Sequence, residues 1–404
     1  MQYKALPSGS TKIPIDSRLV CIDGIRGLAC LMVVLFHCWL HFGRAPGIAI
    51  HAGPFALRLL NPFCIGYGGV DLFFVLSGFC LAYPMLGKPD KAGGWKRYFI
   101  NRMRRILPPY WACLALLAVS SLMIMRCHLT RLESAHAIDW PGLKWLGYAA
   151  FLILPSFNSS FWTLVLEWRW YFVFPLMMRI RRHSSAPALL LIAGLISALS
   201  AAGNNVIHSE KIRALITPLP DFLVLFAIGI WLADLYRRSD LRKTTAWLIR
   251  IAPLGALVML VPVAWLGPGL NAIGGHANFA RDLVWGPFWL FVLLSVLFRP
   301  ALNRLASCRP LAWIGTFSYS LYLIHEPIIR VAAAMILPAK WPHDKLVIVQ
   351  YLGLPLVTIG LAYLFFLAAE RPFLIKRPVF TTNKGAEPEG RLRERAAHLG
   401  SAGH

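Results

Sequence analysis

Long apolar stretches alternate with short polar ones along this chain, without the every-second-residue pattern of a half-buried strand. A helix that crosses a bilayer needs about 20 mostly apolar residues, and the long stretches approach that length. They predict ten helices, at residues 19–42, 64–86, 106–125, 160–178, 186–203, 219–236, 251–267, 283–298, 314–337 and 347–369. We therefore expect an all-α, polytopic membrane bundle over residues 19–375, between polar segments at 1–18 and 376–404.

Lys and Arg are concentrated in every second polar connection, as in 88–105 and 237–250. Because cytoplasmic loops of membrane proteins carry an excess of these residues, both chain termini are predicted to be cytoplasmic. The long connection 126–159 is expected outside, with its apolar part 140–155 re-entrant or interfacial. The tail 376–404, rich in Gly, Ala and charge, is expected to be disordered.

Composition supports the membrane interpretation, because 57% of the residues are hydrophobic and 15% are charged, against about 25% charged in soluble domains. The net charge of +23 follows largely from the basic connections, so we expect membrane lipids and no nucleic acid as partners. The first apolar stretch carries central charges and no small-residue cleavage site, which favours a retained helix over a signal peptide. The eight cysteines form no CxxC pair, so neither a zinc site nor a disulfide framework is indicated.

Ionisable residues inside the first apolar stretch point to a functional site. Asp23, Arg26 and His37 lie there, although a charge at bilayer depth costs about 2.5–3.5 kcal/mol. Arg26 and His37 are eleven positions apart, about three helical turns or roughly 16 Å, and so share one helix face. We expect that face to line one cavity. His41 follows one turn after His37, but no third ligand clusters with them, so no metal is expected.

Further polar side chains lie in other predicted helices. Asp71 is expected either to hold the tautomer of His37 or to cap its own helix. Glu167 lies within the helix 160–178, and Tyr322 and His325 lie within the helix 314–337. An isolated helical histidine is more often a hydrogen-bonding group between helices than a catalytic one, and both interpretations apply to His325.

Arg102, Arg104 and Arg105 form a dense cationic patch in the inner connection 88–105. Guanidinium forks bind phosphate oxygens bidentately, so the patch is a candidate site for a nucleotide-like ligand from the cytosol. Alternatively, these arginines only set the topology beside lipid headgroups. Their position in the sequence does not separate the two interpretations.

Five motifs follow one another along the chain: DGIRG with ten residues between Arg26 and His37, GVDLFFVLSGF around Asp71, RMRRILPPYW from Arg102, WTLVLE from Trp162, and SYSLYLIHEP from Ser318. Together they resemble the bacterial acyltransferase 3 family of integral membrane proteins, over about residues 17–375. The resemblance implies a ten-helix core in the cytoplasmic (inner) membrane. Two positions depart from the family pattern: Asn101 stands where many members have arginine, and Thr163 where serine is usual.

The resemblance also implies the reaction, in which an acyl group moves from a cytoplasmic acyl-CoA to a hydroxyl of a carbohydrate or glycolipid acceptor. Such chemistry needs a base for the hydroxyl and stabilisation of an oxyanion. The family's catalytic pair maps onto Arg26 and His37, with His37 as base or as transient acyl carrier. Asp71 or Glu167 is expected to orient His37.

The family's arginine element for coenzyme A maps onto Arg102 and Arg104, and further donor contacts are expected from Arg105 and Arg26. Acetyl-CoA is the favoured donor by its frequency in the family, succinyl or a longer acyl group stays open, and no metal is expected. The acceptor is open among O-antigen, exopolysaccharide, another surface glycan, a lipid-linked sugar and a glycosylated natural product. The expected substrate-binding residues are Trp162, Tyr322 and His325.

A secondary transporter or flippase for a lipid-linked or anionic substrate is the alternative from another class, because buried charges also mark substrate pathways. Two features count against it. No convincing inverted repeat relates the two halves, and the cationic patch has an evident use in binding a phosphate-rich donor.

Overall fold

The computed structural model describes residues 19–42, 50–52, 55–57, 64–86, 94–134, 158–204, 222–237, 243–273, 278–339 and 341–374. The predicted polar segments at 1–18 and 376–404 lie outside these described residues, as does the predicted re-entrant segment 140–155. The helical unit ends at Phe373.

Helices make up nearly all of the described chain. The first half contains α1 (Val20–His41), η1 (Cys64–Tyr67), α2 (Gly68–Met85), α3 (Gly94–Arg126), α4 (Thr130–Ser134), η2 (Ser159–Phe161), α6 (Trp162–His183) and α7 (Ala186–Asn204). The second half begins with α9 (Leu223–Arg237), α10 (Lys243–Ile273), α11 (Asn278–Phe298), α12 (Pro300–Ala306), α13 (Arg309–Thr316) and α14 (Ser318–Ile336). It ends with η4 (Leu337–Ala339), α15 (His343–Ile348), η5 (Val349–Gly353), α16 (Leu354–Phe365), η6 (Phe366–Glu370) and η7 (Arg371–Phe373). A short antiparallel hairpin joins β1 (Ile50–Ala52) to β2 (Phe55–Leu57).

Each predicted apolar stretch has a helical counterpart, which confirms the helical bundle. Among the described residues, seven helices are long and apolar enough to cross a membrane: Val20–His41, Ile65–Met85, Gly94–Arg126, Ala246–Leu266, Phe279–Phe298, Ser318–Ala339 and Lys345–Phe373. The helices α6, α7 and α9 are outside this set, because α6 carries several charges and the apolar parts of α7 and α9 are shorter. Neither the count of ten spans nor the orientation of the termini is therefore confirmed.

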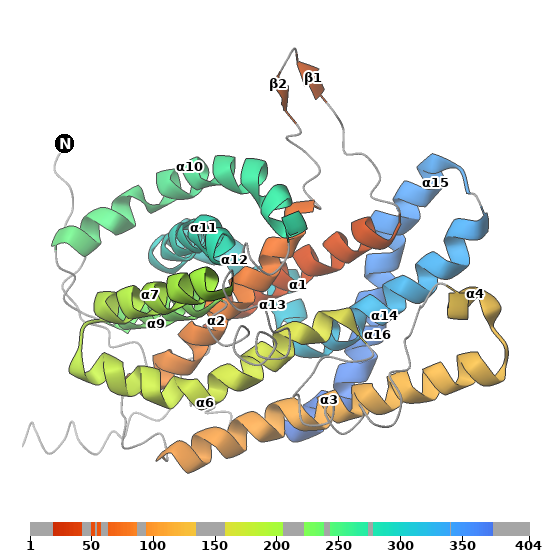
Figure 1. Cartoon of the computed structure of the whole chain (residues 1–404), viewed down its shortest axis with the longest axis horizontal. Coiled ribbons are helices and arrows are strands. Elements are labelled where there is room, and N and C mark those ends of the chain that lie inside the picture. Colours follow the sequence, from red (N-terminus) through yellow and green to blue (C-terminus); the bar gives the residue numbers. More distant parts are fainter. Residues whose placement is uncertain are drawn as a thin grey trace, which may run out of the picture. The chain divides into compact units, whose positions relative to one another are not determined.

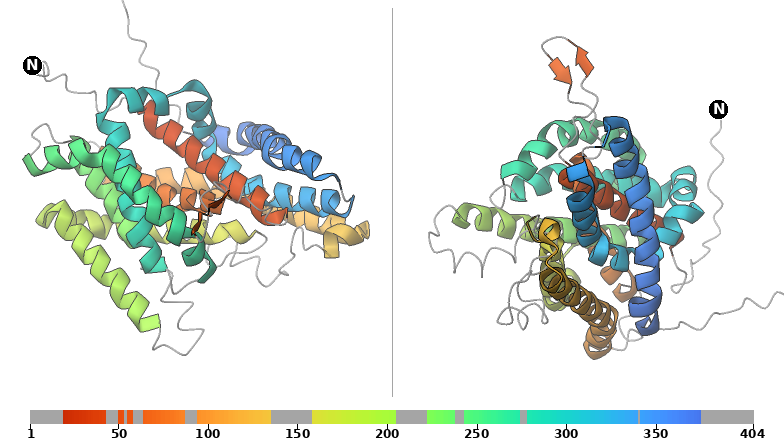
Figure 2. Two further views of the ribbon diagram at one scale, coloured as in Figure 1. Left: turned by 90° about the horizontal axis from the view of Figure 1, so that it is seen from above. Right: turned by 90° about the vertical axis from the view of Figure 1, so that its right-hand side faces the viewer.

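Helix α1 is the central element of the bundle and packs against α2, α13 and α14 (Figure 1). Its residues Ile25, Ala29 and Val33 are buried, and their spacing of four places them on one helix face. In Figure 1 and the left view of Figure 2, α1 lies between the α10–α11 pair and the α14–α16 pair. Packing from both sides explains why charged residues of α1 are inside the protein and not at its surface.

Two close helix contacts depend on glycine. A Cβ atom at Gly24 of α1 would lie 1.7 Å from the backbone oxygen of Ala306. A Cβ atom at Gly78 of α2 would lie 2.1 Å from the backbone oxygen of Phe226 in α9. Helices in membranes associate through such small residues, which let their backbones approach. Gly24 thus lets α12 approach α1 closely, and Gly78 lets α9 approach α2.

Helix α3 differs from the sequence prediction at its start. The sequence predicts a polar connection over 88–105, whereas α3 already includes most of this segment. Tyr98 is buried, and its hydroxyl donates to the backbone oxygen of Tyr171 in α6 at 3.3 Å, so the polar segment has an apolar face that packs. Arg102 and Arg105 are three residues apart and consequently lie on one helix face, not in a loop.

Candidate functional site

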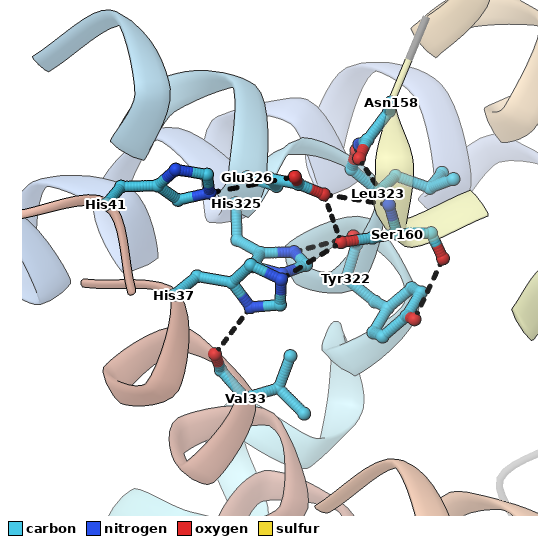
Figure 3. Close-up of polar contacts among 9 residues, drawn as sticks. All are labelled: Val33, His37, His41, Asn158, Ser160, Tyr322, Leu323, His325 and Glu326. Carbon is cyan, nitrogen blue, oxygen red and sulfur yellow. Dashed lines mark hydrogen bonds and ion pairs between the residues drawn. The ribbon is translucent and has the colours of Figure 1, made fainter. Parts of the chain in front are cut away.

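His37 points into the bundle from the last turns of α1 (Figure 3). Its Nδ1 lies 2.9 Å from the carbonyl oxygen of Val33, one turn earlier. Because a carbonyl only accepts hydrogen bonds, Nδ1 carries the proton of the neutral ring and Nε2 keeps its lone pair. Nε2 lies 3.4 Å from Ser160 Oγ. The backbone of α1 thus presents His37 as a proton acceptor.

Ser160 connects His37 to the buried carboxylate of Glu326 on α14. The Ser160 hydroxyl donates a short hydrogen bond to Glu326 Oε2, and the Ser160 backbone N–H donates to the same oxygen at 2.8 Å. The other carboxylate oxygen lies 3.7 Å from Nε2 of His41. Asn158 precedes η2 and accepts the Ser160 N–H as well, at 2.9 Å, which holds the serine in place. Figure 3 shows this chain of contacts from His37 through Ser160 to Glu326 and His41.

Tyr322 and His325 bring α14 against the same site. The ring centroids of His325 and His37 are 4.8 Å apart, and His325 Nδ1 donates to the backbone oxygen of Tyr322 at 2.7 Å. The Tyr322 hydroxyl lies 2.5 Å from Thr163 Oγ1 and donates to the backbone oxygen of Ser160 at 3.0 Å. These bonds tie the start of α6 to α14 and so position Ser160 opposite His37.

Two cavities adjoin this cluster. The first, called the histidine cavity here, is lined by His37, Ser160, Trp162 and Tyr322 together with Tyr67 and Val70. The second, called the arginine cavity, is lined by Arg26, Arg102, Arg105 and Glu167 together with Val70, Thr163 and Tyr322. Tyr322 and Val70 line both cavities and therefore form the wall between them. The sequence predicts one cavity along α1 from Arg26 to His37, whereas the structure divides this path at Tyr322.

The arginine cavity contains two of the three arginines from the predicted cationic patch. Arg102 and Arg105 line it beside Arg26, whereas Arg104 is exposed and is not part of its lining. A spacing of three residues keeps two side chains on one helix face, and a spacing of two does not. The structure therefore brings Arg105, and not Arg104, into the place that the resemblance gave to the second arginine.

Glu167 lies in the arginine cavity and not beside His37. Its Oε1 accepts hydrogen bonds from Ser77 Oγ at 2.9 Å and from the Tyr171 hydroxyl at 2.6 Å. The Arg102 guanidinium carbon lies 5.9 Å from the centroid of the Tyr171 ring. Glu167 thus belongs with the group that surrounds Arg102.

Asp71 does not reach His37 either. It is fully buried in α2, and its Oδ1 accepts from Arg281 Nε at 3.1 Å and Nη2 at 2.8 Å. Arg281 also donates to the Tyr67 hydroxyl at 2.5 Å and lies 4.0 Å from that ring's centroid. The expectation that Asp71 holds the tautomer of His37 is wrong, because a buried carboxylate pairs with the buried cation beside it and a backbone carbonyl orients the imidazole instead.

Three residues of this arrangement escape the sequence analysis. Glu326 lies next to His325 in the same motif, and Ser160 lies at the first turn of a predicted helix. Arg281 precedes the predicted helix 283–298, but α11 begins earlier, at Asn278, and buries it. The sequence signal for Arg281 was its position at the edge of an apolar stretch.

Within the described part of the chain, no three His, Cys, Asp or Glu side chains form a group that could hold a metal.

Comparisons with known proteins bear on this geometry. The profile of the acyltransferase domain family matches residues 19–367. Peptidoglycan O-acetyltransferase OatA of Listeria monocytogenes is 25% identical over 335 residues, which cover 78% of this chain and 50% of that protein. The putative peptidoglycan O-acetyltransferase YrhL of Bacillus subtilis is 23% identical over 329 residues, covering 76% of this chain and 48% of the relative. Putative acetyltransferase ORF330 of Acidianus two-tailed virus is 26% identical over 306 residues, which are 75% of this chain and 81% of that protein.

The chain thus spans about half the length of OatA and YrhL. No solved structure matches it. The family profile extends from the start of α1 into η6, and so covers every element that contributes to the two cavities. The chain therefore belongs to the acyltransferase domain family, acyltransferase 3.

Proposed function

We propose that this protein is a multi-pass O-acyltransferase of the bacterial cytoplasmic membrane, which moves an acetyl group from cytoplasmic acetyl-CoA to a hydroxyl of a carbohydrate on the outer side. One observation carries the proposal: the histidine cavity and the arginine cavity meet at Tyr322. A base is thus separated from a cluster of guanidinium groups by the wall that Tyr322 and Val70 form. The names of OatA and YrhL, which refer to acetylation of peptidoglycan, support a carbohydrate acceptor.

The arginine cavity suits the donor. Coenzyme A carries phosphate groups, and guanidinium groups bind phosphate oxygens through paired, charge-assisted hydrogen bonds. Arg102 and Arg105 line the cavity from α3, and Arg26 lines it from α1. In this arrangement Arg102 and Arg105 hold the phosphates, Arg26 holds the pantetheine arm, and the thioester lies against Tyr322.

The histidine cavity suits the acceptor hydroxyl. Nε2 of His37 takes the hydroxyl proton as the hydroxyl oxygen attacks the thioester carbonyl carbon. The tetrahedral intermediate then collapses, the carbon–sulfur bond breaks, and the coenzyme A thiolate leaves and receives the proton that His37 took up, which returns the imidazole to its neutral form. The imidazolium formed on His37 donates to Ser160 Oγ, and the negative charge of Glu326 beyond Ser160 stabilises it. The Val33 carbonyl therefore takes the orienting role that the sequence analysis gave to Asp71, and Glu326 supplies the negative charge.

The oxyanion of the intermediate needs hydrogen-bond donors placed where its charge develops. The hydroxyls of Thr163 and Tyr322 line the arginine cavity at the wall where the thioester and His37 would meet. Both hydroxyls donate to the backbone oxygen of Ser160, Thr163 at 3.1 Å and Tyr322 at 3.0 Å, so either one stabilises the oxyanion by turning its O–H away from that carbonyl. Thr163 keeps the hydroxyl that serine supplies in many relatives, which fits this use.

The proposal is tested with membranes that carry wild-type protein, His37→Ala, Arg102→Gln/Arg105→Gln or Arg104→Gln at matched expression. Thioester turnover of labelled acetyl-CoA and incorporation of label into surface glycan are both measured. We expect no incorporation with His37→Ala, because the base is missing. The double arginine variant is expected to raise the apparent KM for acetyl-CoA about ten-fold or more, since it loses charge-assisted bonds to phosphate.

Arg104→Gln is the control, because it removes a positive charge from the same helix at a position outside the cavity lining. Its KM is expected to stay near that of wild type. A wild-type protein that consumes no acyl-CoA, or a His37→Ala variant with full activity, would contradict the proposal and favour a transporter. An equal effect of Arg104→Gln would show that the arginines act on topology and not on the donor.

A further inference from the structure

A third cavity lies at the end of α1 that is remote from Arg26. This side cavity is lined by His41, Thr130, Arg131, Arg330, Ala333 and Leu337, among others. Its volume is about 550 Å³, against about 40 Å³ for the histidine cavity. Ligand pockets in proteins typically measure about 300–1,000 Å³. The histidine cavity has room for a hydroxyl group, whereas the side cavity has room for a sugar residue.

The lining of the side cavity is basic. Arg131 comes from α4 and Arg330 from α14, so two separate elements direct guanidinium groups to one cavity, and His41 adds an imidazole from the end of α1. Among the described residues that line it, none carries a carboxylate. Thr130 adds a hydroxyl, and the remaining residues are small or apolar. A ligand with a carboxylate or phosphate group is the chemical class that such a cavity would bind.

Direct contacts connect the side cavity to the catalytic cluster. His41 lines the cavity and lies 3.7 Å from Glu326, which accepts the hydrogen bonds of Ser160 beside His37. The ring centroids of His41 and His37 are 6.0 Å apart, a distance that one sugar residue spans. The described linings of the two cavities share no residue, so in this inference the sugar extends from the side cavity past His41 and Glu326 to bring a hydroxyl to His37.

We propose that the side cavity is the acceptor-binding site and that the acceptor is an anionic carbohydrate, with its carboxylate or phosphate bound by Arg131 and Arg330. This inference rests on the function proposed above. It is tested by binding, without acyl transfer, so that the two can fail separately.

Binding is measured by ligand-induced shifts of the thermal unfolding midpoint, with the full-length protein in phosphatidylcholine nanodiscs. Saturating coenzyme A is present throughout to occupy the arginine cavity. The probes are glucuronate, glucose 6-phosphate and neutral glucose, which separate carboxylate from phosphate and both from an uncharged sugar. We expect at least one anionic sugar to raise the midpoint of the wild-type protein, and glucose to leave it unchanged.

The variant Arg131→Gln/Arg330→Gln is expected to raise the apparent Kd of the anionic sugar about ten-fold or more, because charged hydrogen bonds are lost. Arg126→Gln is the matched control, since Arg126 is exposed at the end of α3 and does not line the cavity. Arg131→Gln alone and Arg330→Lys cover the case in which the double variant fails to fold. The single glutamine variant should weaken binding, and Arg330→Lys should retain most of it.

Three outcomes would overturn the inference: no shift with any probe, equal affinity for glucose, or an unchanged Kd in the glutamine variants. A further arm adds phosphatidylglycerol to the nanodiscs. If this lipid abolishes the sugar response, the cavity binds lipid headgroups and the acceptor assignment is wrong. The His37→Ala experiment decides the proposed function independently of all these results.

Discussion

At the scale of single residues, the candidate base is held by its own helix. Catalytic histidines are often oriented through Nδ1 by a backbone carbonyl or a carboxylate, and here the Val33 carbonyl takes that position while the carboxylate of Glu326 is reached through Ser160. The negative charge is thereby placed on the side of Nε2, where the proton arrives during the reaction. Ser160 makes this link, because its hydroxyl lies between His37 Nε2 and the carboxylate of Glu326.

Replacing Ser160 by alanine should lower kcat for acetyl transfer by about 10²-fold, because the imidazolium of His37 loses its hydrogen-bond acceptor and its link to Glu326. The apparent KM for acetyl-CoA should stay near the wild-type value, since Ser160 does not line the arginine cavity. Steady-state kinetics in membranes measures both constants. Thr163→Ser, which keeps its hydroxyl, serves as control. An unchanged kcat in Ser160→Ala would show that His37 works without this link.

At the scale of elements, close packing and one buried ion pair hold the bundle around the site. Arg281 of α11 pairs with Asp71 of α2, and the same guanidinium holds Tyr67, which lines the histidine cavity. The pair therefore joins two helices and positions one wall of the cavity. Removing one partner of a buried pair leaves an uncompensated charge, whereas replacing both by apolar residues is often neutral.

Arg281→Met or Asp71→Leu alone should lower the free energy of unfolding by about 3–5 kcal/mol, and the double variant Asp71→Leu/Arg281→Met should recover most of that loss. Reversible unfolding in detergent micelles measures these changes. A double variant whose loss equals the sum of the single losses would show that the two side chains do not depend on each other.

Gly78→Ala should also destabilise the protein, because its Cβ would lie 2.1 Å from the backbone oxygen of Phe226 and force α2 and α9 apart. Gly194→Ala is the matched control, since nothing lies within 4 Å of a Cβ at that helical position. We expect Gly194→Ala to leave the melting temperature unchanged or slightly higher, as alanine is the better helix former. Equal melting temperatures for the two variants would contradict the close contact of α2 with α9.

The sequence predicts where the helices lie along the chain better than it predicts which side chains meet between them. Apolar stretches of bilayer length mark the helices directly, and the ends of α1 fall within one residue of those predicted. The start of α3 is missed because its polar face hides a helix that packs through Tyr98. The partner of Asp71 is 210 positions away on another helix, and no local pattern records such a pairing. His37 and Arg26 are identified by their charge inside an apolar run, but Ser160 gains its place only when α6 meets α14.

At the scale of the whole molecule, the proposed reaction requires the two substrates to reach the site from opposite sides of the membrane. Arg102 and Arg105 lie in the first half of α3, and Arg126 ends that helix. Helix α3 has 33 residues, about 50 Å at 1.5 Å per residue, which is longer than the hydrocarbon core of a bilayer. The orientation of the protein can therefore be read from either end of α3.

Cys127 provides that test, because it is exposed immediately after α3. A membrane-impermeant maleimide should label Cys127 in intact cells, and labelling should disappear in Cys127→Ser. Cys308, between α12 and α13, should be labelled only after the cells are permeabilised. Labelling of Cys308 in intact cells, with Cys127 protected, would reverse the predicted orientation.

The wall between the histidine cavity and the arginine cavity also bears on the permeability of the membrane. A bundle that admits one substrate from each side of a membrane has two openings that almost meet, and the hydrogen bonds of Tyr322 to Thr163 and Ser160 keep them apart. Under the proposed function, Tyr322 and Val70 would also have to seal the membrane, because water and ions could otherwise pass between the two cavities. The acyl group would then cross a wall that stays closed to ions, so acyl transfer and the permeability of the membrane would depend on the same two side chains.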